Sequence, residues 1–195
     1  MNREVRIDSE SSNEVITFED LKAWGKVPTD ADDGMITNMI KAVRQLQEEW
    51  TGRSFIGKTL TVNWRTLEGR IYIDLPYGPI RSITSIKRVY EDGTLSDALV
   101  KGTDYYVEGL DFQRVNLYTR WTSAGKIITG LRVTYTAGHG SGTGLVSLPE
   151  PIVDAMLRHV VTDYDQRDDL EVYQPVLYDW VKEALQPYKI DELWL

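Results

Sequence analysis

Cysteine is absent from the 195-residue sequence, which excludes disulfide bonds and thiolate metal sites. Long apolar runs are absent as well. None approaches the roughly 18 residues needed to span a bilayer, so no membrane partner is expected. Residues 1–14 are polar and of mixed charge, unlike a signal or transit peptide. We therefore predict a flexible N-terminal arm at residues 1–15.

Histidine is scarce, and the two histidines do not indicate a metal or catalytic site. His159 and Asp163 stand at positions i and i+4, a spacing that could hold a metal on one helix face. No third ligand stands at a recognisable spacing. We interpret His159 as a packed, hydrogen-bonded core residue, and we expect neither a metal nor a cofactor.

Glycine is concentrated in one stretch, residues 138–144, which matches no phosphate or nucleophile loop. The stretch has no lysine for a Walker loop, and its glycines miss the dinucleotide spacing. An esterase elbow around Ser141 would need glycines at positions 139 and 143, which are occupied by His139 and Thr143. We therefore predict a glycine-rich hinge at residues 138–144.

The net charge of −8 is distributed unevenly along the chain. Residues 1–53 carry 11 acidic and 7 basic side chains, residues 54–137 carry 8 and 11, and residues 138–195 carry 11 and 4. Such asymmetry is typical of surfaces where partners or neighbouring copies meet, although chance clustering of solvated charges is an alternative. The acidic ends argue against a protein that reads DNA sequence, which would carry a basic footprint.

Helical spacing of apolar residues marks the first third of the chain. Thr17 and Asp20 form a capping-box pattern for a short helix. A longer amphipathic helix follows from Asp32 and ends at Gly52, which suits a left-handed position. Its polar face is predicted to carry Lys41, Arg44, Gln45, Glu48 and Glu49.

Helical spacing returns near the C-terminus. One helix is predicted to begin at Pro149, and its inner stripe includes His159. A last helix is predicted between Pro175 and Pro187. We expect residues 16–56 and 145–188 to form one helical body.

Between residues 57 and 137 the apolar spacing changes from 3.6 to 2, which predicts about six short strands. Two of these strands are expected to pair around a turn at residues 67–69, and Asp92-Gly93 is a hairpin-turn signal. The predicted fold class is therefore α+β. A helical body, made of an N-terminal helical hairpin plus C-terminal helices, carries an inserted small antiparallel β unit at residues 57–137.

Acidic residues are densest between positions 163 and 171. Nothing local would raise the pKa of one carboxyl while leaving its neighbour ionised, as glycosidase chemistry requires. A carboxylate-dependent hydrolase is therefore the weaker alternative, and a solvated surface at a subunit contact or a channel is preferred. The candidate residues are Asp165, Asp168, Asp169 and Glu171.

Aromatic residues are abundant, with 6 tryptophans and 11 tyrosines, more than the core of such a domain requires. Tyr77 and Trp121 fall in predicted loops, where exposed aromatic side chains indicate either sugar stacking or a protein interface. A carbohydrate-binding β module with helical flanks is therefore an alternative function. Four tryptophans fall on predicted inner faces: Trp24, Trp50, Trp64 and Trp180.

Residues 189–195 form a short apolar tail with no intrachain reason to be hydrophobic. We predict that Leu193, Trp194 and Leu195 dock on another chain, the alternative being that they pack on their own domain.

Five segments, in order, resemble a known family, although no one of them is specific alone. They are 16–22 (ITFEDLK), 32–53 with its ending EEWTGR, 75–86 (LPYGPIRSITSI), 133–140 (VTYTAGHG) and 148–152 (LPEPI). Together they resemble the head-to-tail connector, or adaptor, proteins of tailed bacteriophages. The resemblance covers residues 15–165 and does not extend past about residue 170.

The resemblance implies a structural virion protein and not an enzyme. Such proteins form a homo-oligomeric ring, usually of twelve copies, in the neck between capsid and tail. The expected partners are the portal protein and the stopper or tail proteins. Double-stranded DNA would pass through the ring during genome packaging and ejection without sequence-specific binding. The resemblance also implies that the C-terminal segment, here the docking tail at 189–195, reaches toward the portal.

Overall fold

The computed structural model describes residues 3–24, 33–65, 71–109, 114–118, 127–140, 147–166 and 176–190. These residues form two units, each with its own hydrophobic core. Unit 1 lies within residues 1–11 and 57–138, and unit 2 lies within residues 12–56 and 139–190. Most of the predicted hinge at 138–144 lies outside the described residues.

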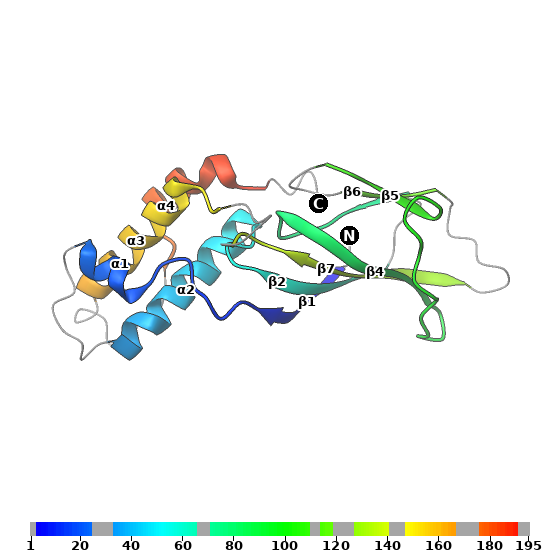
Figure 1. The fold of residues 1–195 in the computed structure, drawn as a ribbon, viewed down its shortest axis with the longest axis horizontal. Coiled ribbons are helices and arrows are strands. Elements are labelled where there is room, and N and C mark those ends of the chain that lie inside the picture. Colours follow the sequence, from blue (N-terminus) through cyan, green and yellow to red (C-terminus); the bar gives the residue numbers. More distant parts are fainter. Residues whose placement is uncertain are drawn as a thin grey trace. The chain divides into compact units, whose positions relative to one another are not determined.

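Unit 1 holds two antiparallel sheets (Figure 1). The first sheet has the strand order β1-β2-β7-β4, and the second has the order β3-β6-β5. The strands are β1 (Arg3–Glu10), β2 (Lys58–Trp64), β3 (Tyr72–Asp74), β4 (Ile80–Tyr90), β5 (Tyr105–Glu108), β6 (Arg114–Leu117) and β7 (Ile128–Ala137).

Alternating side chains of the two sheets build the core of unit 1. On β2 and β7, Val62 lies opposite Val133 and Trp64 lies opposite Leu131, and all four are buried. Val115 of β6 belongs to the same buried cluster. Because each strand places every second side chain on one face, both sheets direct their apolar residues into one shared core, which supports sheet-on-sheet packing.

Two predictions about the strands are wrong. The expected N-terminal arm contains β1, which pairs with β2 from Arg3 to Glu10. The expected pairing around residues 67–69 does not form, because β2 and β3 belong to different sheets and β3 pairs with β6. Alternation of apolar residues shows which face of a strand is buried but not which strand lies beside it. The local pattern therefore could not exclude the next strand in sequence as the pairing partner.

The Asp-Gly turn signal is confirmed. The Tyr90 amide donates to the Thr94 carbonyl at 2.9 Å, and Gly93 has a φ of +81°, a conformation that favours glycine. The chain then returns along β4, where the Ser96 amide donates to the Arg88 carbonyl at 3.0 Å.

Unit 2 is helical. The Thr17 hydroxyl accepts from the Asp20 amide at 3.2 Å, and the Asp20 carboxylate accepts from the Thr17 amide at 2.7 Å, which confirms the capping box. Gly52, with a φ of +68°, ends the long helix as predicted. The helices are α1 (Phe18–Ala23), α2 (Asp33–Thr51), α3 (Glu150–Asp165) and α4 (Asp179–Leu185), followed by a 3-10 turn at Gln186–Tyr188.

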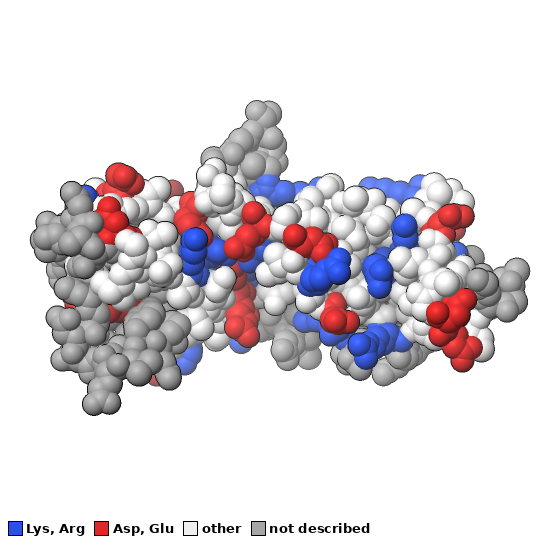
Figure 2. All heavy atoms as spheres, turned by 90° about the horizontal axis from the view of Figure 1, so that it is seen from below, with Lys and Arg blue, Asp and Glu red and all other residues white. Residues whose placement is uncertain are grey.

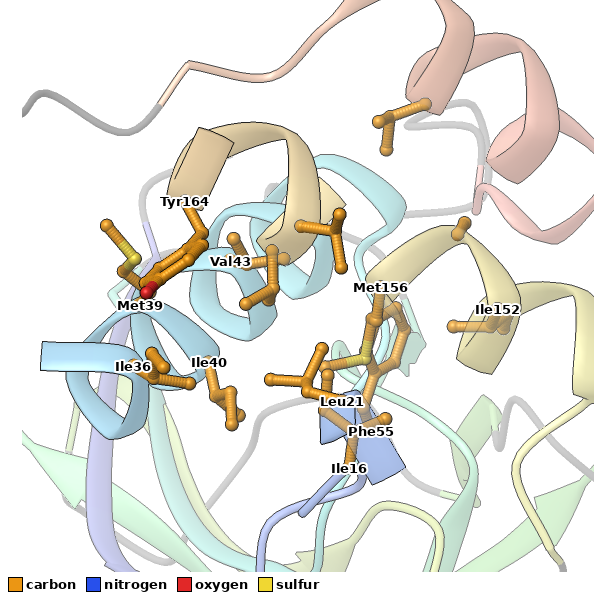
Figure 3. Close-up of a cluster of buried hydrophobic side chains, with 14 of the residues drawn as sticks. Ile16, Leu21, Ile36, Met39, Ile40, Val43, Phe55, Ile152, Met156 and Tyr164 are labelled. Atoms are coloured by element: carbon orange, nitrogen blue, oxygen red, sulfur yellow. The ribbon is translucent and has the colours of Figure 1, made fainter. Parts of the chain in front are cut away.

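The core of unit 2 forms where α1, α2, α3 and α4 contribute buried side chains (Figure 3). Leu21 of α1, Val43 of α2 and Met156 of α3 are almost completely inaccessible to solvent. Figure 3 shows that Phe55, which follows α2, lies among them. The predicted inner stripe of α3 is confirmed, since all of its members are buried: Ile152, Ala155, Met156, His159, Val160 and Tyr164.

The polar face predicted for α2 is wrong in two positions. Arg44 and Glu48 are buried, and so is Gln47. Arg44 donates from Nε to Glu14 at 2.7 Å and from Nη1 to Glu48 at 2.9 Å. The second oxygen of Glu48 accepts from the Phe55 amide at 2.7 Å. This network connects the chain before α1, helix α2 and the loop after it. It allows Arg44 and Glu48 to be buried, because buried charges require partners.

The α+β class is confirmed, and the description of the β part as a small insert is corrected. The described residues contain four α-helices and two antiparallel sheets of four and three strands. The four-stranded sheet recruits β1 from the N-terminal end of the chain, so the β structure is a substantial part of the protein and is not confined to residues 57–137.

Candidate assembly sites

The point at which the C-terminal tail leaves unit 2 is held by three contacts. The Ile190 amide donates to the Thr51 carbonyl at 2.8 Å, and the Arg53 guanidinium donates to the Tyr188 carbonyl. The Lys189 ammonium lies 4.8 Å from the centre of the Trp50 ring, within cation–π distance. These contacts attach the base of the tail to the C-terminal end of α2. The predicted docking residues Leu193, Trp194 and Leu195 lie outside the described residues.

The predicted acidic surface is described only at its start. Asp165 is exposed at the last position of α3, whereas Asp168, Asp169 and Glu171 lie outside the described residues. Asp163, two residues earlier, is buried and accepts a hydrogen bond from the Tyr178 hydroxyl at 2.9 Å. Burial and this bond to Asp163 raise the pKa of Tyr178 to about 12. Asp163 therefore contributes to the interior of unit 2 and not to an acidic surface.

His159 joins three segments of unit 2. Its Nε2 lies 3.0 Å from the Val176 carbonyl, and its Nδ1 lies 3.2 Å from the Gln47 side-chain nitrogen. Because a carbonyl only accepts, Nε2 carries the proton and Nδ1 accepts from Gln47, which corresponds to the neutral ring. The interpretation of His159 as a packed, hydrogen-bonded core residue is confirmed. Its contact with Val176 attaches the segment before α4 to α3.

Acidification should weaken unit 2 through His159. Burial lowers the pKa of His159 below its ordinary 6.5, and the nearby Asp163 carboxylate and the Val176 carbonyl oppose this shift. Because the unfolded chain takes up the proton first, the stabilisation is present above pH 6.5 and declines as the pH falls below it. We expect a lower free energy of unfolding at pH 5.5 than at pH 7.5, measured by urea titration of the helical circular dichroism signal.

The control for this experiment is the other histidine. His159→Gln should reduce the dependence on pH between these two values, whereas His139→Gln should retain it. An unchanged pH dependence in His159→Gln would contradict this explanation.

The aromatic predictions have different outcomes: that for Tyr77 and Trp121 as interface residues stays a prediction, and that for two core tryptophans is wrong. Tyr77 is only half-buried, but it packs against the core of unit 1 and has a positive φ of 60°; Trp121 lies outside the described residues. Trp24 and Trp180, predicted as core residues, are exposed by 45% and 36%. Trp24 is the C-cap of the six-residue helix α1, and Trp180 lies in the first turn of the seven-residue helix α4. Helices this short give too few apolar positions to show from sequence which face is covered.

Tyrosines on the second sheet were not identified from the sequence. Tyr106 and Tyr118 are exposed, and their ring centres lie 5.2 Å apart. Tyr72 and Tyr106 lie on either side of Asn116 in register. These tyrosines come from β3, β5 and the residue after β6, so only the pairing of the strands brings them together.

Neither a membrane-spanning helix nor a metal cluster occurs in the described part of the chain. None of its helices is long and apolar enough to cross a bilayer. No three His, Asp or Glu side chains gather there in a way that could hold a metal ion.

Comparison with known proteins gives structural similarity alone. No family model matches the chain, and no curated protein matches it. The chain is similar in fold to a chain from a neck of an empty gene transfer agent particle with C6 symmetry, at a TM-score of 0.72 and 13% identity, covering 97% of this chain and 96% of that one. A chain from the virion of a native gene transfer agent particle matches with a TM-score of 0.71 and 13% identity over 96% of both chains.

A third similar chain comes from the neck of a native gene transfer agent particle with C12 symmetry. Its TM-score is 0.58 at 16% identity, over 84% of this chain and 86% of that one. At these identities the comparisons establish a shared fold. The fold, with four helices and two antiparallel sheets, is therefore one that also occurs in chains of phage-like particles.

Proposed function

We propose that this protein is a structural component of the neck of a phage-like particle, located between capsid and tail. The observation that carries this proposal is the fold similarity over 97% of the chain to a chain from a particle neck. The similarity spans both units, and it agrees with the resemblance of five sequence segments to phage head-to-tail connectors.

The proposed working form is a ring of twelve copies beneath the portal, which provides a platform for the stopper or tail. A closed ring of twelve identical subunits has both C12 and C6 symmetry, which are the two symmetries recorded for the necks that contain similar chains. Head-to-tail contacts between copies generate such a ring. Its central channel would pass double-stranded DNA, and acidic side chains on the channel wall would repel the phosphates.

This role requires no catalysis and no cofactor. Of the acidic residues considered for a hydrolase, the two that the structure describes lie in different environments, since Asp163 is buried in unit 2 and Asp165 is exposed. A separation of this kind does not supply two carboxyls facing one substrate. We therefore propose an architectural function.

The C-terminal tail is proposed to dock on the portal. Because its base is held at Thr51 and Arg53, the tail starts from a defined point, which limits the entropy lost when it binds. Trp194 is the main anchor in this proposal, since tryptophan is among the residues that contribute most to interfaces.

The experiment is electron microscopy and binding of the purified protein with its portal. We expect rings of twelve copies on the portal. Deletion of Leu193–Leu195 should weaken capture by about 30-fold or more, which corresponds to the roughly 2 kcal/mol of an interface hot spot. The control is Asp191→Asn with Glu192→Gln, which removes charge and keeps the apolar residues. Failure of the intact protein to form rings or to bind the portal would contradict the proposed function.

A further inference from the structure

The outer face of the four-stranded sheet contains a hollow of about 340 Å³. Figure 2 shows one face of the molecule, on which Lys and Arg side chains are interspersed with Asp and Glu. All four strands contribute to the hollow or its rim, and all of its residues belong to unit 1. The lining consists of Glu4, Asn63, Trp64, Arg65, Val89, Thr129, Gly130 and Arg132.

Gly130 lines the hollow at a point where the backbones of β2 and β7 lie close together. A Cβ atom at this position would lie 2.2 Å from the Trp64 carbonyl oxygen and 3.5 Å from the Arg65 Cα. The backbone of β2 therefore approaches β7 closely here.

Positive charge is concentrated beside the hollow. Arg132 of β7 and Lys87 of β4 lie directly opposite each other in register, and like charges in that arrangement repel. The described partner of the Arg132 Nε is the neutral Asn63 side chain, at 2.7 Å. Arg65 pairs with Glu4 at 3.6 Å, but both side chains are largely exposed, so this pair is weak.

This arrangement favours an acidic side chain over a duplex as the ligand. The hollow is a single concave space in the sheet. DNA binding relies on several phosphate contacts along a basic track, whereas a guanidinium beside a hollow suits one carboxylate held by paired hydrogen bonds. The chain itself carries such groups, because residues 138–195 hold 11 acidic and 4 basic side chains.

We propose that the hollow beside Arg65 and Arg132 receives the acidic segment of a second copy of this chain, residues 165–171. The inference rests on the proposed ring, which supplies the second copy. It assigns Asp165, Asp168, Asp169 and Glu171 to a contact between subunits and assigns their counter-charges to unit 1. Repulsion between Arg132 and Lys87 is relieved when a carboxylate enters, so the contact gives the ring a direction and a salt dependence.

The test uses a peptide of residues 165–173 as the probe. The receptor is the full chain with Asp168→Asn, Asp169→Asn and Glu171→Gln, so that its own acidic segment does not compete. We expect binding by fluorescence anisotropy that weakens as salt rises. Adding Arg65→Gln with Arg132→Gln to the receptor should weaken binding by about tenfold, as the loss of two charge contacts at an interface rim implies.

The control receptor carries Lys101→Gln, a loss of positive charge outside the hollow, and should bind the peptide unchanged. A peptide with all its acidic residues replaced by amides should not bind. The inference would be overturned if the peptide did not bind at low salt, or if its affinity were unchanged by replacing Arg65 and Arg132. Displacement of the peptide by a short DNA duplex that binds more tightly to the same arginines would also overturn it.

Ring formation by the unaltered chain is measured separately by sedimentation. If the chain forms normal rings but the peptide does not bind at the hollow, this contact is refuted and the proposed function is unaffected. Peptide binding that depends on both arginines, without rings on the portal, would support the contact and count against the proposed function.

Discussion

Replacing Arg44 with alanine should lower the free energy of unfolding of unit 2 by about 3–5 kcal/mol, the usual cost of removing one partner from a buried ion pair. Arg44 is completely buried and donates to both Glu14 and Glu48. Its removal leaves these carboxylates in a poorly solvated site without their cation. The loss should appear in urea unfolding followed by helical circular dichroism.

A second substitution separates charge from packing in this network. Glu14→Gln removes one of the two negative charges, so it should cost less in the Arg44→Ala background than in the natural protein. Lys41→Ala, on the exposed face of the same helix, is the matched control and should change stability by no more than about 0.5 kcal/mol. A loss below about 1 kcal/mol for Arg44→Ala would show that the network contributes little.

Gly130→Ala should destabilise unit 1 by about 3 kcal/mol, at the upper end of the range for overpacking. The added methyl group would meet the Trp64 carbonyl at 2.2 Å, and that atom belongs to the backbone of a paired strand. Relief requires β2 and β7 to separate locally, which disturbs hydrogen bonds and the buried contact between Trp64 and Leu131. Thermal unfolding and amide hydrogen exchange of β2 and β7 would measure the effect.

Gly57→Ala provides the matched control in the same unit. A Cβ atom at Gly57 would have nothing within 4 Å, so the substitution should be neutral or slightly stabilising by limiting the unfolded chain. Equal stability of the two variants would contradict the close approach at Gly130.

The helices were accessible from sequence because their determinants are local. The capping interaction of Thr17 and Asp20 spans three residues, and the glycine at position 52 acts on the turn beside it. The inner stripe of α3 repeats every three to four residues. Each of these signals is complete within a few turns, so no knowledge of the rest of the chain is needed to interpret it.

The partners of the strands were not accessible in this way. β1 contains only a short apolar alternation, and it becomes a strand because β2 offers an edge more than 50 residues later, from Lys58 to Trp64. The burial of Arg44 has the same origin. Periodicity placed this residue on a polar face, but Glu14, 30 residues away, accepts its hydrogen bonds and makes burial favourable.

The candidate sites also fall into those that the sequence indicates and those that only the structure shows. The apolar tail and the acidic residues were proposed from sequence because both are anomalous in composition, and they stay proposals. The hollow could not be foreseen, because it depends on Gly130 lying against Trp64 and on Arg132 lying opposite Lys87. In each of these two pairs, the sequence around one residue does not indicate which residue lies against it.

The sequence by itself determined the α+β class, the capped helices and the uneven distribution of charge, since these follow from spacing and composition. The tertiary structure alone decided which strands pair, which charges are buried and where cations gather around an open space. Such properties depend on the free energy of contacts between distant residues, and these contacts exist only after the chain has folded.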